Sequence, residues 1–412
     1  MIPLSVEEVR AIAPGELDGS GELTGLEIDS RRVGPGDLFV AIRGGREFVG
    51  QARRRGAATL VPDDEFAAMA AIGRELRKRS AARFVGVTGS TGKTSTKDIL
   101  STLCAGVVRT VSTEGSYNAE LGVPLTLGRL EPDTEVCIVE LGMRGFGQIT
   151  ELCEIARPDI GVITAIGPVH LELVGSVDGV ARSKAELVAA LPEGGIAVVP
   201  RSAELDPHLR DDVEIRRVGP VDVELRDDGA HVEFSGGRIR FPFNSRHQAQ
   251  NALTALTAYD ALGLPLDRLA ESAAAVRLSP WRGEELALPG GGFVVNDAYN
   301  ANPTSMEAAL RHLAERGSGH RLVAILGGMA ELGEHAASHH REIAELAAAL
   351  GIEVIAVGEL GRAYAAATWE PDAAGALAAA RGVVRPGDAV LVKASRSVAL
   401  EGIAPKLAKL PA

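Results

Sequence analysis

Short apolar runs rich in β-branched residues, each followed by a glycine-containing loop and an amphipathic or alanine-rich segment, recur along most of this chain. The alternation predicts strands joined by helical crossovers, and therefore an α/β fold built on parallel sheets. Two series of buried strands are expected. They cover residues 83–88, 135–140, 159–166 and 195–199, and then residues 293–296, 321–326, 352–357 and 388–393.

The length of 412 residues exceeds what one ordinary hydrophobic core supports, so the chain is expected to form several domains. We place boundaries near residues 80 and 279, which gives domains at 1–80, 81–279 and 280–412. Between the two strand series, the segments "VEIRRV", "VDVEL", "HVEF" and "RIRF" alternate apolar and polar residues. This period of two predicts antiparallel strands attached to the middle domain.

Charge, cysteine content and hydropathy argue against several classes of protein. The formal net charge of -12 argues against nonspecific nucleic-acid binding, which needs a basic surface. Cys104, Cys137 and Cys153 lack the spacing of a metal site or a disulfide framework and fit a reducing cytosol. Neither an apolar run of the roughly 18 residues that span a membrane nor a signal-like N-terminus occurs. We therefore expect a soluble, cytoplasmic protein.

The segment "RFVGVTGSTGKTSTKDIL" at residues 83–100 places a glycine-rich loop between a predicted strand and a predicted helix. Backbone N–H groups of such a loop bind phosphate oxygens, and a lysine at the helix N-terminus reaches the terminal phosphates. Gly89, Gly92, Lys93 and Thr94 supply these groups, although Val87 stands where the strict P-loop pattern has its first glycine. An ordinary strand-to-helix turn is the alternative, and the strand–loop–helix context favours nucleotide binding.

Two further polar residues follow predicted strands of the same sheet. Glu140 ends "EVCIVE", and His170 follows "DIGVITAIGPV". Taken singly, the glutamate fits a solvated strand end and the histidine a structural or surface position. Because the carboxyl ends of parallel strands form the ligand crevice of such sheets, both residues are candidates for a magnesium and phosphate site.

The segment "VDGVARSKAELVAAL" predicts a helix with a lysine on its apolar face. Val180, Leu187, Val188 and Leu191 form an apolar stripe at helical spacing, and Lys184 lies on that stripe. A lysine in this position usually extends its ammonium to solvent. Alternatively, Lys184 faces a site, where it either pairs with an anion or is modified so that it becomes one.

Polar residues also end the predicted strands of the last region. Asp297, Tyr299, Asn300 and Asn302 follow one strand, and Thr304 and Glu307 have the spacing of a helix capping box. Another strand, "AVLVK", ends with Lys393, and Ser395 and Arg396 follow. Each of these residues could belong to a turn or a solvated cap. Together they predict a second crevice whose cations suit anionic groups.

Eight motifs, in order along nearly the whole chain, resemble those of the Mur ligases. They are "TGSTGKTS", "YNAELGVPLTL", "VELGMRGFGQI", "HLE" with the downstream "SKAE", "RHQAQNALTALTA", "NDAYNANPTSM", "GGMAELGEH" and "VKASRS". The resemblance implies three domains: an N-terminal domain for the UDP end of the substrate, a central P-loop ATPase domain and a Rossmann-like C-terminal domain that brings the incoming amine. These domains agree with the boundaries drawn above.

The family activity implied is the ATP-dependent formation of an amide bond in peptidoglycan synthesis. Within the family, "DAYNANPTSM", "GMAELG" and "VKASRS" are most similar to the members that join D-alanyl-D-alanine to UDP-MurNAc-tripeptide. ATP would phosphorylate the substrate carboxylate, because a carboxylate is a poor electrophile until it carries a good leaving group. The resemblance also implies two Mg²⁺ ions, and we expect a monomer.

The resemblance assigns roles residue by residue. Catalytic roles fall on Lys93, Glu140, His170 and Lys184. Metal ligands would be Thr94, Glu140, His170 and Lys184, the last as a carbamate formed with carbon dioxide. Contacts to ATP would come from Gly89, Ser90, Thr91, Gly92, Lys93, Thr94, Ser95, Asn251, Arg282 and Asp297. Contacts to the other substrates would come from Asp29, Ser30, Arg31, Asn118, Tyr299, Asn300, Asn302, Lys393 and Arg396.

The N-terminal region departs from the family pattern. After "FVAIRGG" relatives continue into a stretch with Asp-Gly-His before a phenylalanine, whereas this chain has the shorter "REFVGQARRRGA". The trimmed domain leaves open a Mur-like ligase that acts on a different carboxylate acceptor or amino-acid donor. Two other classes are weaker alternatives. A GTPase or small-molecule kinase would not need the second Rossmann-like region, and a catalytically silent scaffold would not need all four catalytic residues.

Overall fold

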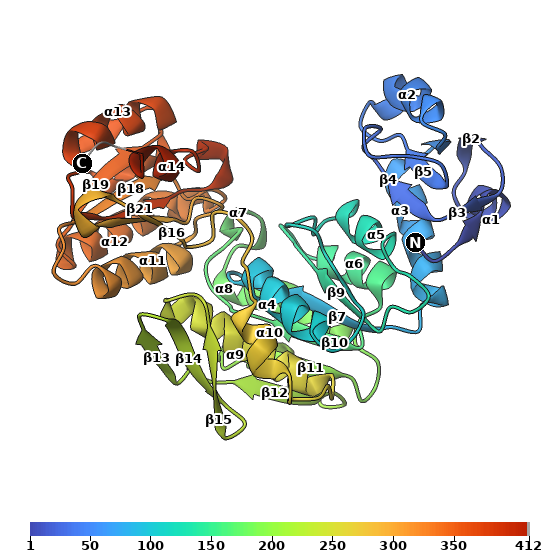
Figure 1. The fold of residues 1–412 in the computed structure, drawn as a ribbon, viewed down its shortest axis with the longest axis horizontal. Helices are drawn as coiled ribbons and strands as arrows, with labels where there is room; N and C mark the ends of the chain where they lie inside the picture. The colour runs from blue at the N-terminus through green and yellow to red at the C-terminus, as the bar shows by residue number, and fades with distance from the viewer. Residues whose placement is uncertain (410–412) are drawn as a thin grey trace. The chain divides into compact units, whose positions relative to one another are not determined.

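The computed structural model describes residues 1–409, and Figure 1 labels its helices and strands. The chain forms two compact units. The first comprises residues 1–165, 182–244 and 249–277, and the second comprises residues 166–181, 245–248 and 278–412. Among the described residues, no helix is long and apolar enough to cross a membrane.

The first unit begins with a small mixed sheet. Its order is β2-β6-β5-β4, in which β4, β5 and β6 are parallel and β2 is antiparallel to β6. The strands of this region are β1 (Leu4–Ser5), β2 (Gly15–Asp18), β3 (Glu22–Leu23), β4 (Gly25–Glu27), β5 (Asp37–Val40) and β6 (Ala58–Pro62). Its helices are α1 (Val6–Ile12), η1 (Gly45–Phe48), α2 (Val49–Arg54) and α3 (Glu65–Arg79).

A six-stranded parallel sheet forms the centre of the first unit. Its order is β12-β11-β10-β7-β9-β8. The strands are β7 (Arg83–Thr88), β8 (Thr110–Ser112), β9 (Val136–Glu140), β10 (Ile160–Ile163), β11 (Ile196–Pro200) and β12 (Glu214–Val218). The four strands predicted in this region are confirmed, and β7 lies between β10 and β9. The carboxyl ends of these three strands therefore meet at one edge.

One prediction for this region is wrong. The segment at 214–218 was expected to be antiparallel, but β12 pairs in parallel with β11 as the edge strand of the central sheet. An edge strand is partly exposed, so it alternates polar and apolar residues whichever direction it runs. The antiparallel prediction holds for the separate sheet of β13 (Val223–Arg226), β14 (Gly229–Phe234) and β15 (Gly237–Phe241).

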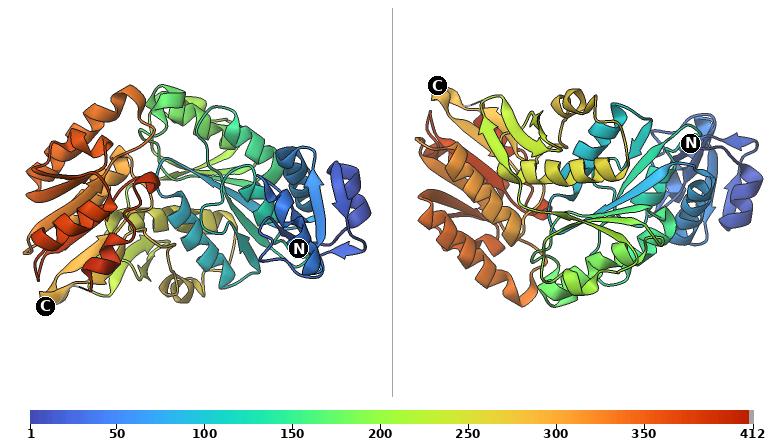
Figure 2. Two further views of the ribbon diagram at one scale, coloured as in Figure 1. Left: turned by 90° about the horizontal axis from the view of Figure 1, so that it is seen from above. Right: turned by 90° about the horizontal axis from the view of Figure 1, so that it is seen from below.

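Helices cover both faces of the central sheet (Figure 2). On one face α4 packs on β7, β8 and β9 and contacts α10, and on the other α6 packs on β7 and contacts α5 and α3. The helices along this part of the chain are α4 (Lys93–Ala105), α5 (Gly122–Leu127), α6 (Gln148–Ala156), α7 (Leu171–Val174), α8 (Val177–Ala189), η2 (Asp206–His208), α9 (Arg246–Ala261) and α10 (Leu269–Ala274), of which α7 lies in the second unit.

The second unit contains another six-stranded sheet, of order β16-β17-β21-β18-β19-β20, in which only the edge strand β16 is antiparallel. The strands are β16 (Glu284–Ala287), β17 (Phe293–Asn296), β18 (Leu322–Gly327), β19 (Ile352–Val357), β20 (Thr368–Glu370) and β21 (Ala389–Lys393). All four strands predicted here are confirmed. The helices are η3 (Pro289–Gly291), α11 (Pro303–Arg316), η4 (Gly333–His335), α12 (Ala336–Ala349), η5 (Leu360–Tyr364), α13 (Ala373–Val383), η6 (Arg396–Val398) and α14 (Ile403–Leu407).

The two faces of this second sheet are covered by helix pairs. Helices α11 and α12 pack together on one face, and α13 and α14 pack together on the other (Figure 1). The core between the sheet and α13 and α14 includes Val294, Ile325, Ile355, Val390 and Leu400. Strands buried on both faces explain why the sequence reads there as short continuous apolar runs.

The capping box predicted for α11 lies two residues earlier than expected. Asn302 is the N-cap, its side chain accepts a hydrogen bond from the Ser305 N–H, and the Ser305 hydroxyl accepts one from the Asn302 N–H. Pro303 suits the first helical position because its fixed φ matches the helix and it has no N–H to leave unpaired. Glu307 forms an ion pair with Arg311 one turn later instead.

Candidate active site

The glycine-rich loop connects the end of β7 to the start of α4, as predicted. Strand β7 ends at Thr88, Gly92 is the N-cap of α4, and Lys93 is its first residue. The Nζ of Lys93 donates a hydrogen bond of 2.8 Å to the carbonyl oxygen of Gly89. A strand, a tight loop and a 13-residue helix thus present the N–H groups and partial positive charge that bind phosphate.

Two glycines of this loop are required by their surroundings. Gly89 and Gly92 have φ angles of 151° and 79°. A Cβ atom on Gly89 would lie 1.9 Å from the Thr164 hydroxyl oxygen, and one on Gly92 would lie 2.2 Å from the Asn251 Oδ1. Asn251, predicted to contact the nucleotide, therefore packs directly against the phosphate loop from α9.

Glu140 ends β9 beside the loop, where its strand pairs with β7. The side chain is 1% exposed, which contradicts the solvated strand end considered for it. Its Oε1 accepts a 2.7 Å hydrogen bond from the Asn118 Nδ2, whereas its Oε2 is buried without a hydrogen-bond partner. A buried carboxylate oxygen that lacks a donor is costly to fold and suits a bound cation.

Lys184 is 1% exposed on α8, so it does not extend to solvent as a lysine on an apolar stripe usually does. Burial lowers the pKa of its amine well below the ordinary value, and the nearby positive charge of Lys93 lowers this pKa further. The structure therefore brings Lys93 and a buried, easily deprotonated lysine close together.

Lys97 was not predicted as a site residue, yet it supports Glu140 through a loop. Its buried Nζ donates to the carbonyl oxygens of Thr113 at 2.8 Å and Gly115 at 3.1 Å, and lies 2.6 Å from the Asp98 carboxylate. The Thr113 hydroxyl accepts the N–H of Glu140 at 3.0 Å. The loop after Thr113 carries Asn118. Lys97 could have been predicted from the sequence, because it lies four residues after Lys93 on the same helix.

His170 lies in the second unit and pairs with a residue that sequence reasoning did not single out. Its Nδ1 is 2.5 Å from the Glu331 Oε2. His170 and Glu331 have φ angles of 53° and 62°, in the left-handed region that residues other than glycine rarely adopt. Such strained residues cluster at functional sites. Glu331 belongs to the "GGMAELGEH" motif, which was the signal for it.

The predicted crevice of the second unit is assembled from the ends of β17 and β21. Lys393 is 2% exposed, and its Nζ lies 2.5 Å from the Asp297 Oδ2 and 3.0 Å from the Asn300 carbonyl oxygen. Arg282 stacks over the Tyr299 ring at 4.0 Å. The Lys393 charge is thus matched by Asp297 in this structure.

Arg396 and Asn302 have other partners in the same unit. The Arg396 guanidinium lies 2.7 Å from the Glu401 carboxylate and 4.5 Å from the centre of the Trp281 ring. It remains largely exposed and can reach an anion. Asn302 caps α11 and is therefore structural in part.

In the N-terminal region the three predicted substrate contacts occupy one turn. Asp29 and Arg31 form an ion pair of 2.8 Å, and this hydrogen-bonded guanidinium lowers the pKa of the Asp29 carboxyl to about 2. The Ser30 hydroxyl donates to the Gln51 Oε1 at 2.8 Å. The Arg31 side chain is 78% exposed and can swing to a ligand.

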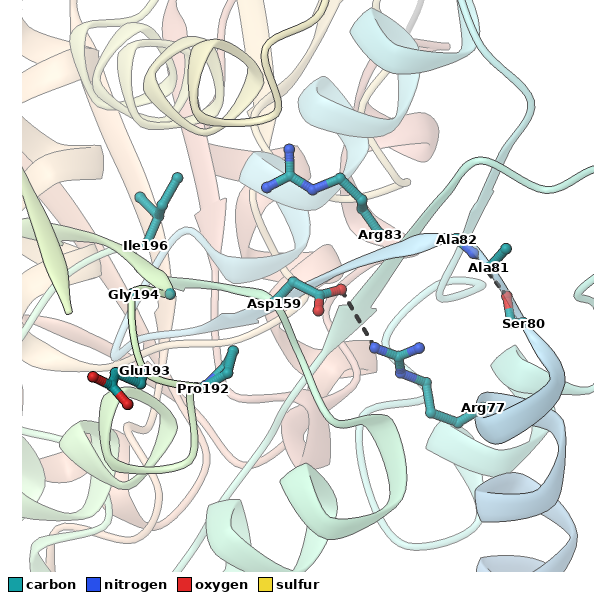
Figure 3. Close-up of a pocket in the computed structure, with 11 residues that line it drawn as sticks. Arg77, Ser80, Ala81, Ala82, Arg83, Asp159, Pro192, Glu193, Gly194 and Ile196 are labelled. Carbon is teal, nitrogen blue, oxygen red and sulfur yellow. Dashed lines mark hydrogen bonds and ion pairs between the residues drawn. The ribbon is translucent and has the colours of Figure 1, made fainter. Parts of the chain in front are cut away.

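A cavity of 450 Å³ lies at the opposite strand ends, where β7, β10 and β11 begin (Figure 3). Figure 3 shows Asp159 facing Arg77, and the two form an ion pair of 3.3 Å. Arg77 also donates to the Ala156 carbonyl oxygen at 2.9 Å, and the Phe84 N–H donates to Asp159 at 2.7 Å. These bonds tie α3 and α6 to the sheet, so we regard this cavity as structural.

Two histidines of the second unit, His247 and His312, have lowered pKa values. Burial lowers the pKa of His247 to about 4, with Asp297 acting in the opposite direction, and burial also lowers the pKa of His312. Because these folded-state values lie below the ordinary value of about 6.5, the unfolded chain binds the proton first as pH falls. Stability is therefore retained above about pH 6.5 and is lost progressively as pH falls toward 4.

We expect His247→Gln to flatten this acid dependence. Chemical denaturation of the full chain between pH 7.5 and 4.5 should show the unmodified protein losing on the order of 2 kcal/mol more than the variant, after allowance for the exposed part of the ring. The exposed His335 provides the matched control, and His335→Gln should leave the pH dependence unchanged. Parallel pH curves for the unmodified chain and His247→Gln would refute this origin of the acid sensitivity.

The chain is similar in sequence to known protein families and to known enzymes. Residues 87–259 match the family described as Mur ligase middle domain, and residues 281–396 match that described as Mur ligase, glutamate ligase domain. The UDP-N-acetylmuramoyl-tripeptide--D-alanyl-D-alanine ligase of Escherichia coli (strain K12) is 30% identical over 403 residues, which cover 89% of this chain and 89% of that protein.

Two solved structures are similar over most of the chain. A crystal structure of MurF from Acinetobacter baumannii has a TM-score of 0.86 and 27% identity, and the match covers 99% of each chain. MurF ligase from Thermotoga maritima, solved in complex with ADP, has a TM-score of 0.82 and 26% identity, and the match covers 93% of this chain and 97% of that one.

Proposed function

This chain belongs to the Mur ligase family, and we propose that it joins D-alanyl-D-alanine to UDP-N-acetylmuramoyl-tripeptide at the expense of ATP. The products are UDP-MurNAc-pentapeptide, ADP and phosphate. The observation that carries the choice of substrates is the match to the Escherichia coli ligase over 89% of both chains. Membership of the family makes the GTPase, kinase and silent-scaffold alternatives unnecessary.

The chemistry proceeds in two displacement steps. A carboxylate oxygen of the tripeptide attacks the γ-phosphorus of ATP, the bond to the bridging oxygen breaks, and ADP leaves. The amine of D-alanyl-D-alanine then attacks the acyl carbon, a tetrahedral intermediate forms, and the phosphate departs with the bonding electron pair as the nitrogen loses a proton. Positive groups placed before the reaction stabilise the negative charge that develops on the phosphoryl oxygens.

The phosphate loop supplies those groups. Lys93 and the N–H groups at the start of α4 would hold the β- and γ-phosphates. Gly89, Ser90, Thr91 and Ser95 complete the loop and the first turn of the helix. Asn251 packs against Gly92, so it would hold the loop in place while facing the nucleotide. Arg282 and Asp297 are further proposed contacts to the nucleotide.

The residues around the loop suit magnesium. The buried Oε2 of Glu140, which lacks a donor, and the hydroxyl of Thr94 are oxygen ligands of the type that Mg²⁺ prefers. Lys184 would contribute as a carbamate, and His170 would be a further ligand with Glu331 orienting its ring. Bound Mg²⁺ would neutralise charge on the phosphate oxygens. No cluster of three or more His, Cys, Asp or Glu side chains occurs in residues 1–409, so hydroxyl, carbamate and phosphate oxygens would have to complete the shell.

The three-domain division remains part of this proposal. Residues 1–80 would bind the UDP end through Asp29, Ser30 and Arg31, residues 81–279 would bind ATP, and residues 280–412 would bind the incoming amine. Asn118 would contact the muramoyl portion while it holds Glu140. Tyr299, Asn300, Asn302, Lys393 and Arg396 are proposed to line the junction of peptide and amine. We also propose that the reaction takes place in the cytoplasm, where ATP and nucleotide-linked substrates occur, and that the protein is a monomer that needs no nucleic acid.

The direct test is phosphate release from the full chain with ATP, magnesium and UDP-MurNAc-tripeptide, with and without D-Ala-D-Ala, and a mass measurement of the product. Strict dependence on the dipeptide and a pentapeptide product are expected. Because the N-terminal region is shortened, one alternative function remains: a Mur-like ligase that acts on another carboxylate acceptor or amino-acid donor. Competition among D-Ala-D-Ala, single amino acids and diamino acids separates the two, and phosphate release that ignores the dipeptide would reject our assignment.

A further inference from the structure

The phosphate loop is held from outside by the end of a neighbouring strand. Thr164 directly follows β10 and is 9% exposed. Its hydroxyl lies 2.5 Å from the Thr91 carbonyl oxygen and 3.2 Å from the Thr88 carbonyl oxygen, and its N–H donates to Thr88 at 2.9 Å. The Ser90 N–H donates to the Ala165 carbonyl oxygen at 2.8 Å. The first half of the loop is thus joined to residues 164–165 at several points.

One of these bonds fixes the orientation of the Thr91–Gly92 peptide at the start of α4. In a trans peptide the carbonyl and the following N–H point in opposite directions. The Thr164 hydroxyl holds the Thr91 carbonyl on the outer side of the loop, so the Gly92 N–H is directed to the inner side, where α4 begins. That N–H is one of the donors that a glycine-rich loop offers to a phosphate oxygen.

The contact is specific to the hydroxyl group. A hydroxyl has a single proton to donate, and the shorter distance assigns it to Thr91 rather than Thr88. The absence of a side chain at Gly89 is what allows Thr164 to approach, because a Cβ there would lie 1.9 Å from the hydroxyl oxygen. Gly89 therefore leaves the space that the Thr164 hydroxyl occupies, and the hydrogen bond from that hydroxyl orients the loop.

We propose that Thr164 is a positioning residue for the nucleotide: it orients the Thr91–Gly92 peptide so that the Gly92 N–H binds the phosphate chain of ATP or ADP. The inference rests on the proposed use of ATP and adds a residue from outside the loop that sets the affinity for phosphate. Thr164 itself does not touch the ligand. Without its hydroxyl, the peptide can rotate, and the loop must be ordered again each time a nucleotide binds.

The test is ADP affinity, measured by calorimetry on the full chain, for Thr164→Val, Thr164→Ser and a matched control. Valine keeps the shape of threonine and removes the donor, so we expect ADP binding to weaken by about tenfold or more. Serine keeps the donor and should bind ADP within about threefold of the unmodified chain. Thr102→Val removes a hydroxyl that donates 2.9 Å to the Asp98 carbonyl oxygen further along α4, and it should leave ADP affinity unchanged.

Two further measurements separate positioning from general destabilisation. Thermal unfolding of Thr164→Val should stay close to that of Thr102→Val, since each loses one hydroxyl-to-carbonyl hydrogen bond. In turnover assays the KM for ATP should rise in Thr164→Val while the KM for D-Ala-D-Ala stays constant. If valine prevents folding, the comparison of Thr164→Ser with Thr164→Ala decides, because those two side chains differ by one hydroxyl group.

The outcomes distinguish this inference from the proposed function. Equal ADP affinity in the unmodified chain and Thr164→Val, or in the serine and alanine variants, overturns the role of Thr164 and leaves the ligase assignment intact. A folded unmodified chain that binds no ADP overturns the proposed use of ATP, and the role of Thr164 with it. Weak ADP binding confined to the variants that lack the hydroxyl supports both.

Discussion

Lys93→Ala should lower ATP-dependent phosphate release by about 10²–10³-fold while the chain stays folded. The Lys93 amine stands at the first residue of α4, where it would neutralise charge as the γ-phosphoryl is transferred. Removing one such preorganised donor costs about 10²–10³-fold in kcat. The fold should survive, because the 2.8 Å bond from Lys93 to the Gly89 carbonyl lies within a loop that β7 and residues 164–165 also hold.

The control for this variant is a lysine of the same unit that lies away from the loop. Lys78 on α3 is 76% exposed, so Lys78→Ala removes the same charge without touching the site. Phosphate release and thermal unfolding should be measured on both variants and on the unmodified chain. Turnover by Lys93→Ala at the rate of Lys78→Ala would remove the loop from the mechanism.

Much of the fold could be predicted because its strands are local patterns. The predicted strands of the two parallel sheets are mostly apolar runs buried on both faces, and all eight are confirmed. The direction of β12 could not be read, because an exposed edge strand alternates in the same way in either direction. The capping box of α11 begins at Asn302 rather than Thr304, because Pro303 suits the first helical position and the helix therefore starts there.

The site was predicted best where the chain itself brings groups together. The loop from Gly89 to Thr94 is contiguous, so its residues had to share one place. Thr164 contacts the loop from a strand that lies 73 residues away along the chain, and Glu331 reaches His170 across 161 residues. Such contacts depend on which strands and loops are neighbours, and no local pattern encodes that. Lys393 shows the same limit, since its partner Asp297 comes from another strand.

We expect the removal of the Lys184 side chain to reduce activity severely, and we expect small carboxylates to restore part of that activity. Its amine is buried, and desolvation together with the charge of Lys93 lowers its pKa well below the ordinary value. At neutral pH such an amine is available as a nucleophile. Its nitrogen can attack the carbon of carbon dioxide, and loss of a proton leaves a carbamate anion. An anion beside Lys93 removes the repulsion between two cations and supplies oxygens for magnesium.

Lys184→Ala should therefore lose at least about 10²-fold in phosphate release, as expected when one charge-stabilising group is removed. Acetate or formate should restore part of this activity by placing a carboxylate in the space that the side chain leaves, whereas chloride at equal ionic strength should not. Carbon-13 NMR with labelled bicarbonate gives a second readout, a carbamate signal in the unmodified chain that Lys184→Ala lacks.

The exposed Lys406 on α14 provides the matched variant for this experiment, and Lys406→Ala should keep both the turnover and the carbamate signal. A fully active Lys184→Ala would refute the requirement for this residue. An inactive Lys184→Ala with no carbamate signal in the unmodified chain would assign Lys184 a role as an amine. A neutral, unmodified amine at Lys184 would also avoid repulsion by the positive charge of Lys93. The carbamate signal is therefore the decisive measurement, since it reports the modification itself rather than the loss of activity.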